Sequence, residues 1–196
     1  MPTLSEAHPF PKARWAALAW LLFWFPVYAR TWGWANFLHL CDVAVILTCA
    51  GFWLGSPLLL ASQAIASIVL DVAWDLDVLW RLLSGRHLFG GTEYLFDSSF
   101  PLAVRLLSLF HVVLPVLLVL SLRRMGYDRR GFLLQCAIAL AVLGVSLLPG
   151  SQANLNFVFQ TPWGRALGPL HFAIVAASLM GLVYLPTHLV LRACFR

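Results

Sequence analysis

Charged residues are scarce in this chain. Only 11% of its 196 residues are Asp, Glu, Lys or Arg, whereas 61% are hydrophobic and the mean hydropathy is +0.85. A water-soluble domain carries roughly 25% charged residues, which coat its surface. The composition therefore excludes a disordered protein, a disulfide-rich secreted domain and a cytosolic globular enzyme.

The familiar catalytic motifs are also missing. The chain contains no HExxH, GxSxG, Walker or GxGxxG pattern. These patterns mark zinc hydrolases, serine hydrolases, and nucleotide or dinucleotide sites, so no nucleotide cofactor is expected. The four cysteines form no CxxC or Cys/His zinc spacing, and we expect them to be free thiols inside or near apolar segments.

What the chain does have is long apolar stretches between short turns. About 20 residues cross a bilayer core of ~30 Å. The pattern predicts an all-α, polytopic transmembrane helical bundle that forms one domain over residues 1–196. The six predicted spans are 15–28, 34–54, 57–83, 100–124, 132–148 and 169–191. Because the apolar run of the first is short, a cleaved signal peptide is the alternative, which leaves five spans.

The distribution of Lys and Arg predicts the orientation. With both termini in the cytoplasm, most of these residues fall on the cytoplasmic side, and the basic loop 123–130 accounts for much of the bias. Basic loops beside an anionic leaflet explain the net charge of +5 without any nucleic-acid partner. Membrane lipid is the expected partner, and the oligomeric state is left open.

Polar side chains inside the spans are the most informative feature, since each costs roughly 2.5 to 3.5 kcal/mol at mid-helix and persists only when paired or useful. Gln63, Ser67, Asp71 and Asp75 form an i, i+4 stripe on one helix face. The other members of the set are Asn36, His39, Asp42, Arg105 and His111. Counted from the outer surface, nearly all of these ionisable residues fall in the outer half of the membrane, which predicts an outward-opening polar cavity.

The outer loop 84–99 is expected to lie above this cavity. It carries Glu93 and Asp97 beside a Gly-Gly turn, and the alternative is that both are ordinary solvated acids. Asp77, which precedes the loop, is expected to be solvated or paired with Arg81 at the interface.

Imidazole and carboxylate groups together suit either a divalent metal ion or proton transfer. The predicted metal ligands are His39, Asp42, Asp71, Asp75 and His111. Asp71, Asp75 and His111 are the candidate catalytic groups. Arg105, Asn36 and Glu93 are the candidate substrate-binding groups. We therefore expect an enzyme that acts on a lipid or another amphiphile. The alternatives are an ion-coupled transporter or permeation protein, and a structural subunit with a buried polar network.

Two resemblances bear on these hypotheses. The segments Asn36-Phe37-Leu38, Cys41-Asp42, 56–59, 107–111 and 126–130 resemble a family of small bacterial integral membrane proteins without an assigned activity. That resemblance implies a bacterial inner-membrane location. The mixed His/Asp set resembles, in general layout only, the intramembrane metal-dependent lipid hydrolases, but the paired-histidine spacing of those enzymes is not reproduced.

Overall fold

The computed structural model describes residues 8–161 and 164–195, so the ends of the predicted domain at 1–7 and 196 lie outside the described residues. Every regular element in the described ranges is helical. The longer elements are α1 (Ala13–Trp32), α2 (Leu40–Leu54), α3 (Pro57–Ser84), α6 (Phe110–Met125), α7 (Gly131–Val145), α8 (His171–Ser178) and α9 (Leu185–Cys194). The shorter ones are η1 (Trp34–Leu38), α4 (Glu93–Phe96), α5 (Leu102–Leu106), η2 (Leu107–Leu109), η3 (Leu155–Phe157), η4 (Gly168–Leu170) and η5 (Leu179–Tyr184).

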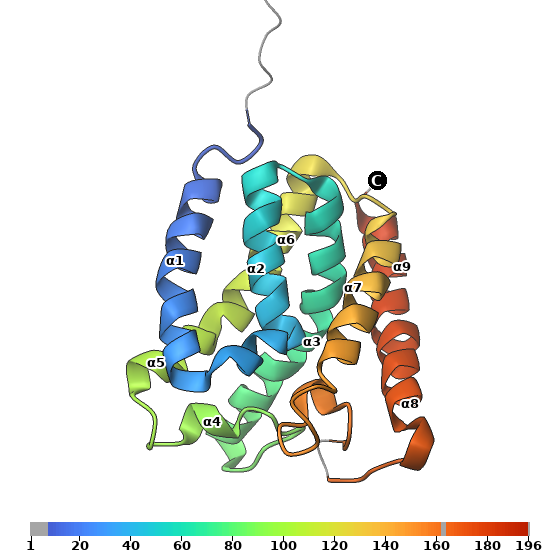
Figure 1. The fold of residues 1–196 in the computed structure, drawn as a ribbon. Coiled ribbons are helices and arrows are strands. Elements are labelled where there is room, and N and C mark those ends of the chain that lie inside the picture. Colours follow the sequence, from blue (N-terminus) through green and yellow to red (C-terminus); the bar gives the residue numbers. More distant parts are fainter. Residues whose placement is uncertain (1–7, 162–163, 196) are drawn as a thin grey trace, which may run out of the picture.

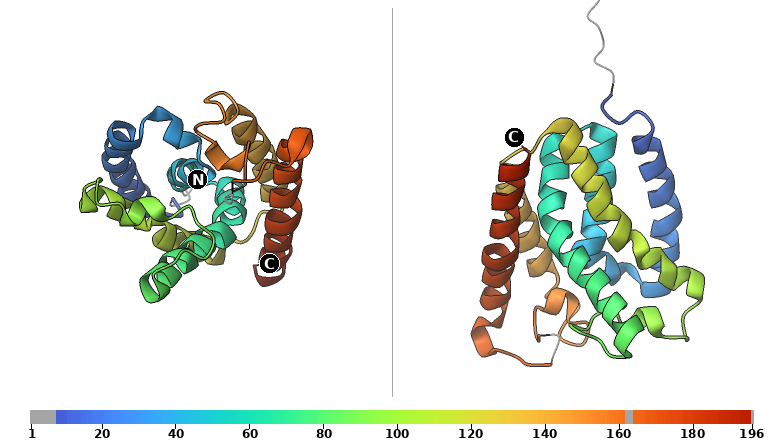
Figure 2. Two further views of the ribbon diagram at one scale, coloured as in Figure 1. Left: turned by 90° about the horizontal axis from the view of Figure 1, so that it is seen from below. Right: turned by 180° about the vertical axis from the view of Figure 1, so that it is seen from behind.

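The long helices run alternately up and down and form a bundle (Figure 1). The start of α1 and the end of α9 lie at the same end of the bundle, which we call the terminal end. α4, α5 and the connection 146–170 lie at the opposite end, which we call the loop end (Figures 1 and 2). α3 packs against α2, α6, α7 and α9, so residues on several of its faces are buried.

Local sequence sets the limits of α2 and α3. Gly55 ends α2 with a φ of +60°, a left-handed conformation that glycine adopts without strain. Ser56 then caps α3, because its Oγ accepts a hydrogen bond from the Leu59 amide at 3.3 Å. Pro57 occupies the first turn, where its missing N–H leaves no hydrogen bond unmade. α2 and α3 therefore form an antiparallel pair.

Within the described residues, three segments are long and apolar enough to cross a membrane: Pro57–Ser84, Leu102–Met125 and Gly168–Cys194. The surface agrees with this, because Leu22, Leu148 and Leu182 are 68%, 81% and 76% exposed. Contiguous exposed apolar side chains are rare on soluble monomers and are expected on a lipid-facing surface. These observations support an all-helical membrane protein.

Six spans, as predicted from the apolar stretches, are not supported by helix length and composition. α2 and α7 have 15 residues each, or about 22 Å of helix against a core of ~30 Å. The predicted ranges also included apolar residues that the structure places in other elements: residues 34–38 form η1, and residues 146–148 form a turn. Apolar residues in these connections lengthened the predicted spans beyond the helices themselves.

Candidate functional site at the loop end

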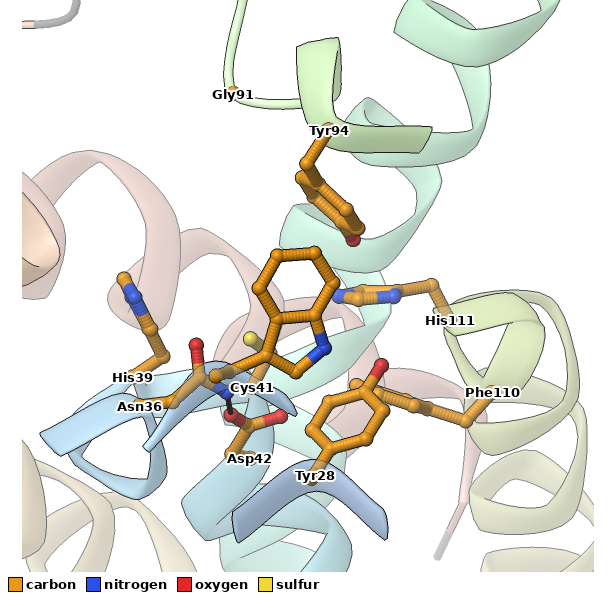
Figure 3. A pocket seen from close by; sticks show the side chains of 10 residues that line it. Tyr28, Asn36, His39, Cys41, Asp42, Gly91, Tyr94, Phe110 and His111 are labelled. Carbon is orange, nitrogen blue, oxygen red and sulfur yellow. Dashed lines mark hydrogen bonds between the residues drawn. The ribbon is translucent and has the colours of Figure 1, made fainter. Parts of the chain in front are cut away.

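A cavity of about 310 Å³ opens at the loop end of the bundle, and we call it the polar cavity. Its walls come from α1, η1, the start of α2, the loop that carries α4, and the start of α6 (Figure 3). The lining residues are Tyr28, Trp32, Asn36, His39, Cys41, Asp42, Gly91, Tyr94, Phe110 and His111. Five separate parts of the chain thus contribute to one small volume.

Asp42 lies in the first turn of α2 and is only 2% exposed. The Asn36 side-chain amide donates a hydrogen bond to Asp42 Oδ2, because η1 places Asn36 opposite the start of α2 (Figure 3). Within the part of the chain that the structure describes, Asp42 forms no ion pair and Oδ1 has no hydrogen-bond donor. The carboxylate is therefore buried with one neutral partner.

Asn156 fixes the segment that carries Asn36 and His39. Its Oδ1 accepts from the Leu40 amide at 2.9 Å, and its Nδ2 donates to the Leu38 carbonyl at 2.7 Å. The same Nδ2 donates to Ser146 Oγ at 2.8 Å, at the end of α7. One side chain thus joins the entry to α2 to the connection 146–170, and it braces that wall of the polar cavity.

His111 is held in one orientation at the start of α6. Its Nδ1 donates to the Ser108 carbonyl at 2.7 Å, so Nε2 is the unprotonated nitrogen of a neutral ring. The imidazole stacks on Trp74 at 4.4 Å and on Phe110 at 4.1 Å. The short η2 turn also brings Ser108 Oγ within 2.7 Å of the Tyr28 hydroxyl. A proton acceptor and two hydroxyl groups therefore lie at one side of the cavity.

Tyr94 enters the polar cavity from α4, with its hydroxyl directed toward His111 and Tyr28 (Figure 3). Burial raises the pKa of the Tyr94 phenol, and the Ser108 and Trp74 side chains only partly offset that rise. The phenol is consequently a hydrogen-bond donor throughout the physiological pH range.

Asp77 holds the loop that carries Tyr94. Its Oδ1 accepts from the amides of Leu88, Phe89 and Gly90 at 2.7, 2.6 and 3.1 Å. Its Oδ2 accepts from the Thr92 hydroxyl and contacts His87 Nδ1 at 2.9 Å. The prediction of a solvated or Arg-paired Asp77 was wrong: the residue is 1% exposed, because the loop folds back over it and supplies its donors.

The stripe on α3 is buried, but it does not line the polar cavity. Ser67 and Asp71 are 2% and 1% exposed, and Asp75 is half-buried. Ser67 Oγ, Asp71 Oδ2 and Asp75 Oδ1 have no hydrogen-bond partner within the described residues.

The structure thus separates the predicted site residues into groups. Asn36, His39, Asp42 and His111 come together in the polar cavity, whereas Asp71 and Asp75 lie on α3 outside its lining.

The remaining two, Arg105 and Glu93, support the loop instead of the cavity. Arg105 donates from a terminal guanidinium nitrogen to the Leu95 carbonyl at 2.8 Å. Glu93 Oε2 accepts from the Gly91 amide at 2.7 Å.

The predicted metal ligands do not form one coordination sphere. Across residues 8–161 and 164–195, no group of three or more His, Cys, Asp or Glu side chains is placed to hold a metal ion. His39, Asp42 and His111 line the cavity at separate points, and the two α3 carboxylates lie elsewhere (Figure 3).

A second, apolar cavity of about 380 Å³ lies between α1, α2 and the α5–α6 segment. Its lining is almost entirely hydrophobic and includes Ala17, Trp20, Phe52, Leu114 and Leu117. Phe110 belongs to the lining of both cavities. A polar volume and an apolar volume therefore meet at one aromatic ring.

Sequence reasoning missed the aromatic walls, Tyr28, Trp32, Tyr94 and Phe110. Aromatic residues near span ends are ordinarily attributed to the membrane interface. Tyr28 and Trp32 are four residues apart and share a helix face directed toward Asn36, which is the one signal that sequence spacing offered.

Comparisons with protein-family models, with curated proteins and with solved structures found no match to this chain. The two cavities and the groups that line them are therefore the basis for assigning a function.

Proposed function

We propose that the protein binds a membrane amphiphile, with the polar end in the polar cavity and the apolar chain in the apolar cavity. The observation that carries this proposal is that Phe110 lines both cavities, one of which holds Asn36, Asp42 and His111 while the other is almost entirely hydrophobic. A molecule with one polar and one apolar end matches both volumes at once. Few other ligands of a membrane protein need both.

The two cavities contribute differently to binding. Lipid tails around the protein are as apolar as the lining of the apolar cavity, so moving the chain into it gains little free energy. The polar end gains directed partners, namely Asn36, Asp42, Tyr94 and His111. We therefore expect the polar cavity to decide which amphiphile binds.

We propose acid–base hydrolysis as the chemistry of the bound amphiphile. Neutral His111 can accept a proton at Nε2 from a water molecule, whose oxygen then adds to the carbonyl carbon of an ester. The ester C–O bond then breaks to release the acid, and the Nε2 proton passes to the departing alkoxide, which leaves as an alcohol. A positioned base of this kind contributes roughly 10² to 10⁴ in rate. The Tyr94 phenol, which stays protonated, is a donor on the same side of the cavity.

The binding proposal can be tested with bromine-labelled dodecanol and purified full-length protein in a maltoside detergent. Bromine quenches the fluorescence of nearby tryptophan, and Trp20 lines the apolar cavity. Saturable quenching is expected, and it should fall in Trp20→Phe. Ala17→Leu fills the cavity and should weaken binding by roughly tenfold, while the matched change Ala19→Leu lies on an exposed part of α1. Equal quenching in both leucine variants would overturn the proposal.

The hydrolysis proposal has its own test. The ester 4-nitrophenyl dodecanoate is offered to wild-type protein, and His111→Gln should lower its turnover by roughly a hundredfold. His188→Gln, at the terminal end, is the control, since His188 bonds Tyr127 far from the cavity. Turnover that is unchanged in His111→Gln would remove the acid–base step and leave binding as the function.

A second candidate function, ion-coupled permeation, is favoured by the continuation of the α3 stripe. Gln63 lies one helical turn nearer the terminal end than Ser67. Its side-chain amide donates to Gln135 at 3.4 Å, and Gln135 donates to the Tyr184 hydroxyl at 3.2 Å. Polar groups thus extend from Asp75 toward the terminal end. Proton flux into proteoliposomes that is lost in Asp71→Asn would favour this function over hydrolysis.

We propose a bacterial inner-membrane location with antiparallel membrane crossings and both termini in the cytoplasm. In support, the basic loop 123–130 lies at the terminal end, together with the start of α1, which carries Lys12 and Arg14, and the end of α9, which carries Arg192 (Figure 1). A reporter fused after Arg130 should read cytoplasmic. A periplasmic signal would invert the orientation and place the polar cavity on the cytoplasmic side.

A further inference from the structure

The polar cavity contains a buried acid without a cationic partner. Among the described residues, its lining includes the Asp42 side chain and no Lys or Arg. Asp42 is 2% exposed, and its hydrogen-bond partner Asn36 is neutral. A second buried acid, Asp71, is 1% exposed on α3 and lies outside the lining. Buried charges in proteins are ordinarily paired, so a cation bound in the cavity would supply the missing partner.

The remaining walls suit a cation as well. Tyr28, Trp32, Tyr94 and Phe110 line the same volume. Trp32 meets Tyr94 at 5.5 Å with an interplanar angle of 78°, and it meets Tyr28 at 6.5 Å with an angle of 68°. Rings set steeply to one another form the walls of a box. The faces of aromatic rings attract ammonium groups, and such boxes recognise quaternary ammonium ligands.

The backbone amides beside the cavity that could bind an anionic head are already used. The amides of Leu88, Phe89 and Gly90 donate to Asp77, and the Gly91 amide donates to Glu93. Arg105 donates to the Leu95 carbonyl and lies outside the lining. An exposed phosphate or sulfate group would therefore meet Asp42 without a cation to offset it.

We infer that the polar cavity takes the ammonium head of a cationic amphiphile, with Asp42 as its counter-ion and the Tyr28, Trp32, Tyr94 and Phe110 rings as its walls. This inference rests on the proposed amphiphile binding and names the chemical class of the bound head. The chain of the same molecule occupies the apolar cavity beyond Phe110.

Three dodecyl probes that differ only in the head test the inference: dodecyltrimethylammonium, dodecanol and dodecyl sulfate. Affinities are measured by displacement of bromine-labelled dodecanol from full-length protein in maltoside detergent. The ammonium probe should bind at least roughly tenfold tighter than dodecanol, and dodecyl sulfate should bind more weakly than dodecanol. Asp42→Asn should remove the preference of the ammonium probe over dodecanol.

Tyr94→Leu provides a second variant in case Asp42→Asn fails to fold. Loss of one ring should weaken the ammonium probe by roughly tenfold relative to dodecanol. The control is Phe89→Leu, whose ring is 45% exposed on the same loop and outside the lining. Tetramethylammonium should compete with the full ammonium probe, since it carries the head without the chain.

The outcomes separate the two proposals. Equal affinity for all three probes would overturn the ammonium head and leave amphiphile binding intact. Tighter binding of dodecyl sulfate, or an ammonium preference that survives in Asp42→Asn, would also overturn it. Failure of every probe to bind would remove amphiphile binding itself.

Discussion

Polar side chains are buried at both ends of the bundle, but their hydrogen bonding differs. Toward the terminal end, Gln63 donates to Ser62 Oγ at 2.9 Å and to Gln135, which in turn donates to Tyr184. Toward the loop end, Asp71 and Asp75 each keep a buried oxygen without a partner among the described residues. Paired groups hold helices together, whereas unpaired groups lower stability unless a ligand completes them.

The loop end also contains Asp77, an acid with hydrogen bonds to both carboxylate oxygens. Its removal should have the largest effect on the free energy of unfolding. Asp77→Ala leaves three backbone amides, Thr92 and His87 without their acceptor, and should lower the free energy of unfolding by roughly 3 kcal/mol. Thermal unfolding in detergent measures this loss. The exposed loop acid Asp97, changed to Ala, should shift stability by less than about 0.5 kcal/mol. Equal effects of the two changes would contradict the anchoring role of Asp77.

α3 and α7 pack closely at the terminal end, and Gly131→Ala tests how much this contact contributes to stability. A Cβ atom at Gly131 would lie 2.9 Å from both Ala61 Cβ and the Ser62 backbone nitrogen, so α7 would have to move away from α3. We expect a loss of about 2 kcal/mol in unfolding free energy. Gly144→Ala on the same helix meets open space and serves as the control. Stability unchanged by Gly131→Ala would show that the α3–α7 contact tolerates separation.

The paired network itself should contribute less. Gln63→Leu removes the donor to Gln135 and Ser62 and is expected to lower the unfolding free energy by about 1 kcal/mol. The same change at Gln135 and the double variant complete a mutant cycle measured by thermal unfolding. Additive single changes would mean that the two glutamines do not act as one network.

Replacement of the unpaired acid Asp71 should raise the stability of the protein, and this is the smallest of the expected changes. Asp71→Asn replaces a buried acid, whose Oδ2 has no hydrogen-bond partner among the described residues, with an amide that cannot ionise, so the thermal midpoint should rise, by an amount equivalent to roughly 0.5 to 1 kcal/mol. A clear loss of stability in this variant would show that Asp71 is already paired. In that case the contrast between the two ends of the bundle would not hold.

Several site residues could be predicted from the sequence because in-span polar groups are rare. Asn36, His39, Asp42 and His111 were identified in this way, and all four line the polar cavity. Asp77 was misjudged, since its five partners belong to a loop ten or more residues away and no spacing rule connects them. The aromatic walls were missed because aromatic residues near span ends are ordinarily attributed to the membrane interface.

Local sequence determined the features that depend on short-range physics. The hydrophobic composition requires a membrane environment, helix periodicity puts Ser67, Asp71 and Asp75 on one face, and Gly55-Ser56-Pro57 forces the turn between α2 and α3. Only the tertiary structure decided which buried polar groups have hydrogen-bond partners, because these pairs form between segments that are distant in the sequence. Asp77 accepts hydrogen bonds from a loop that returns over it, and Gln63 donates to Gln135. Asp42 lines a cavity whose other walls are aromatic rings.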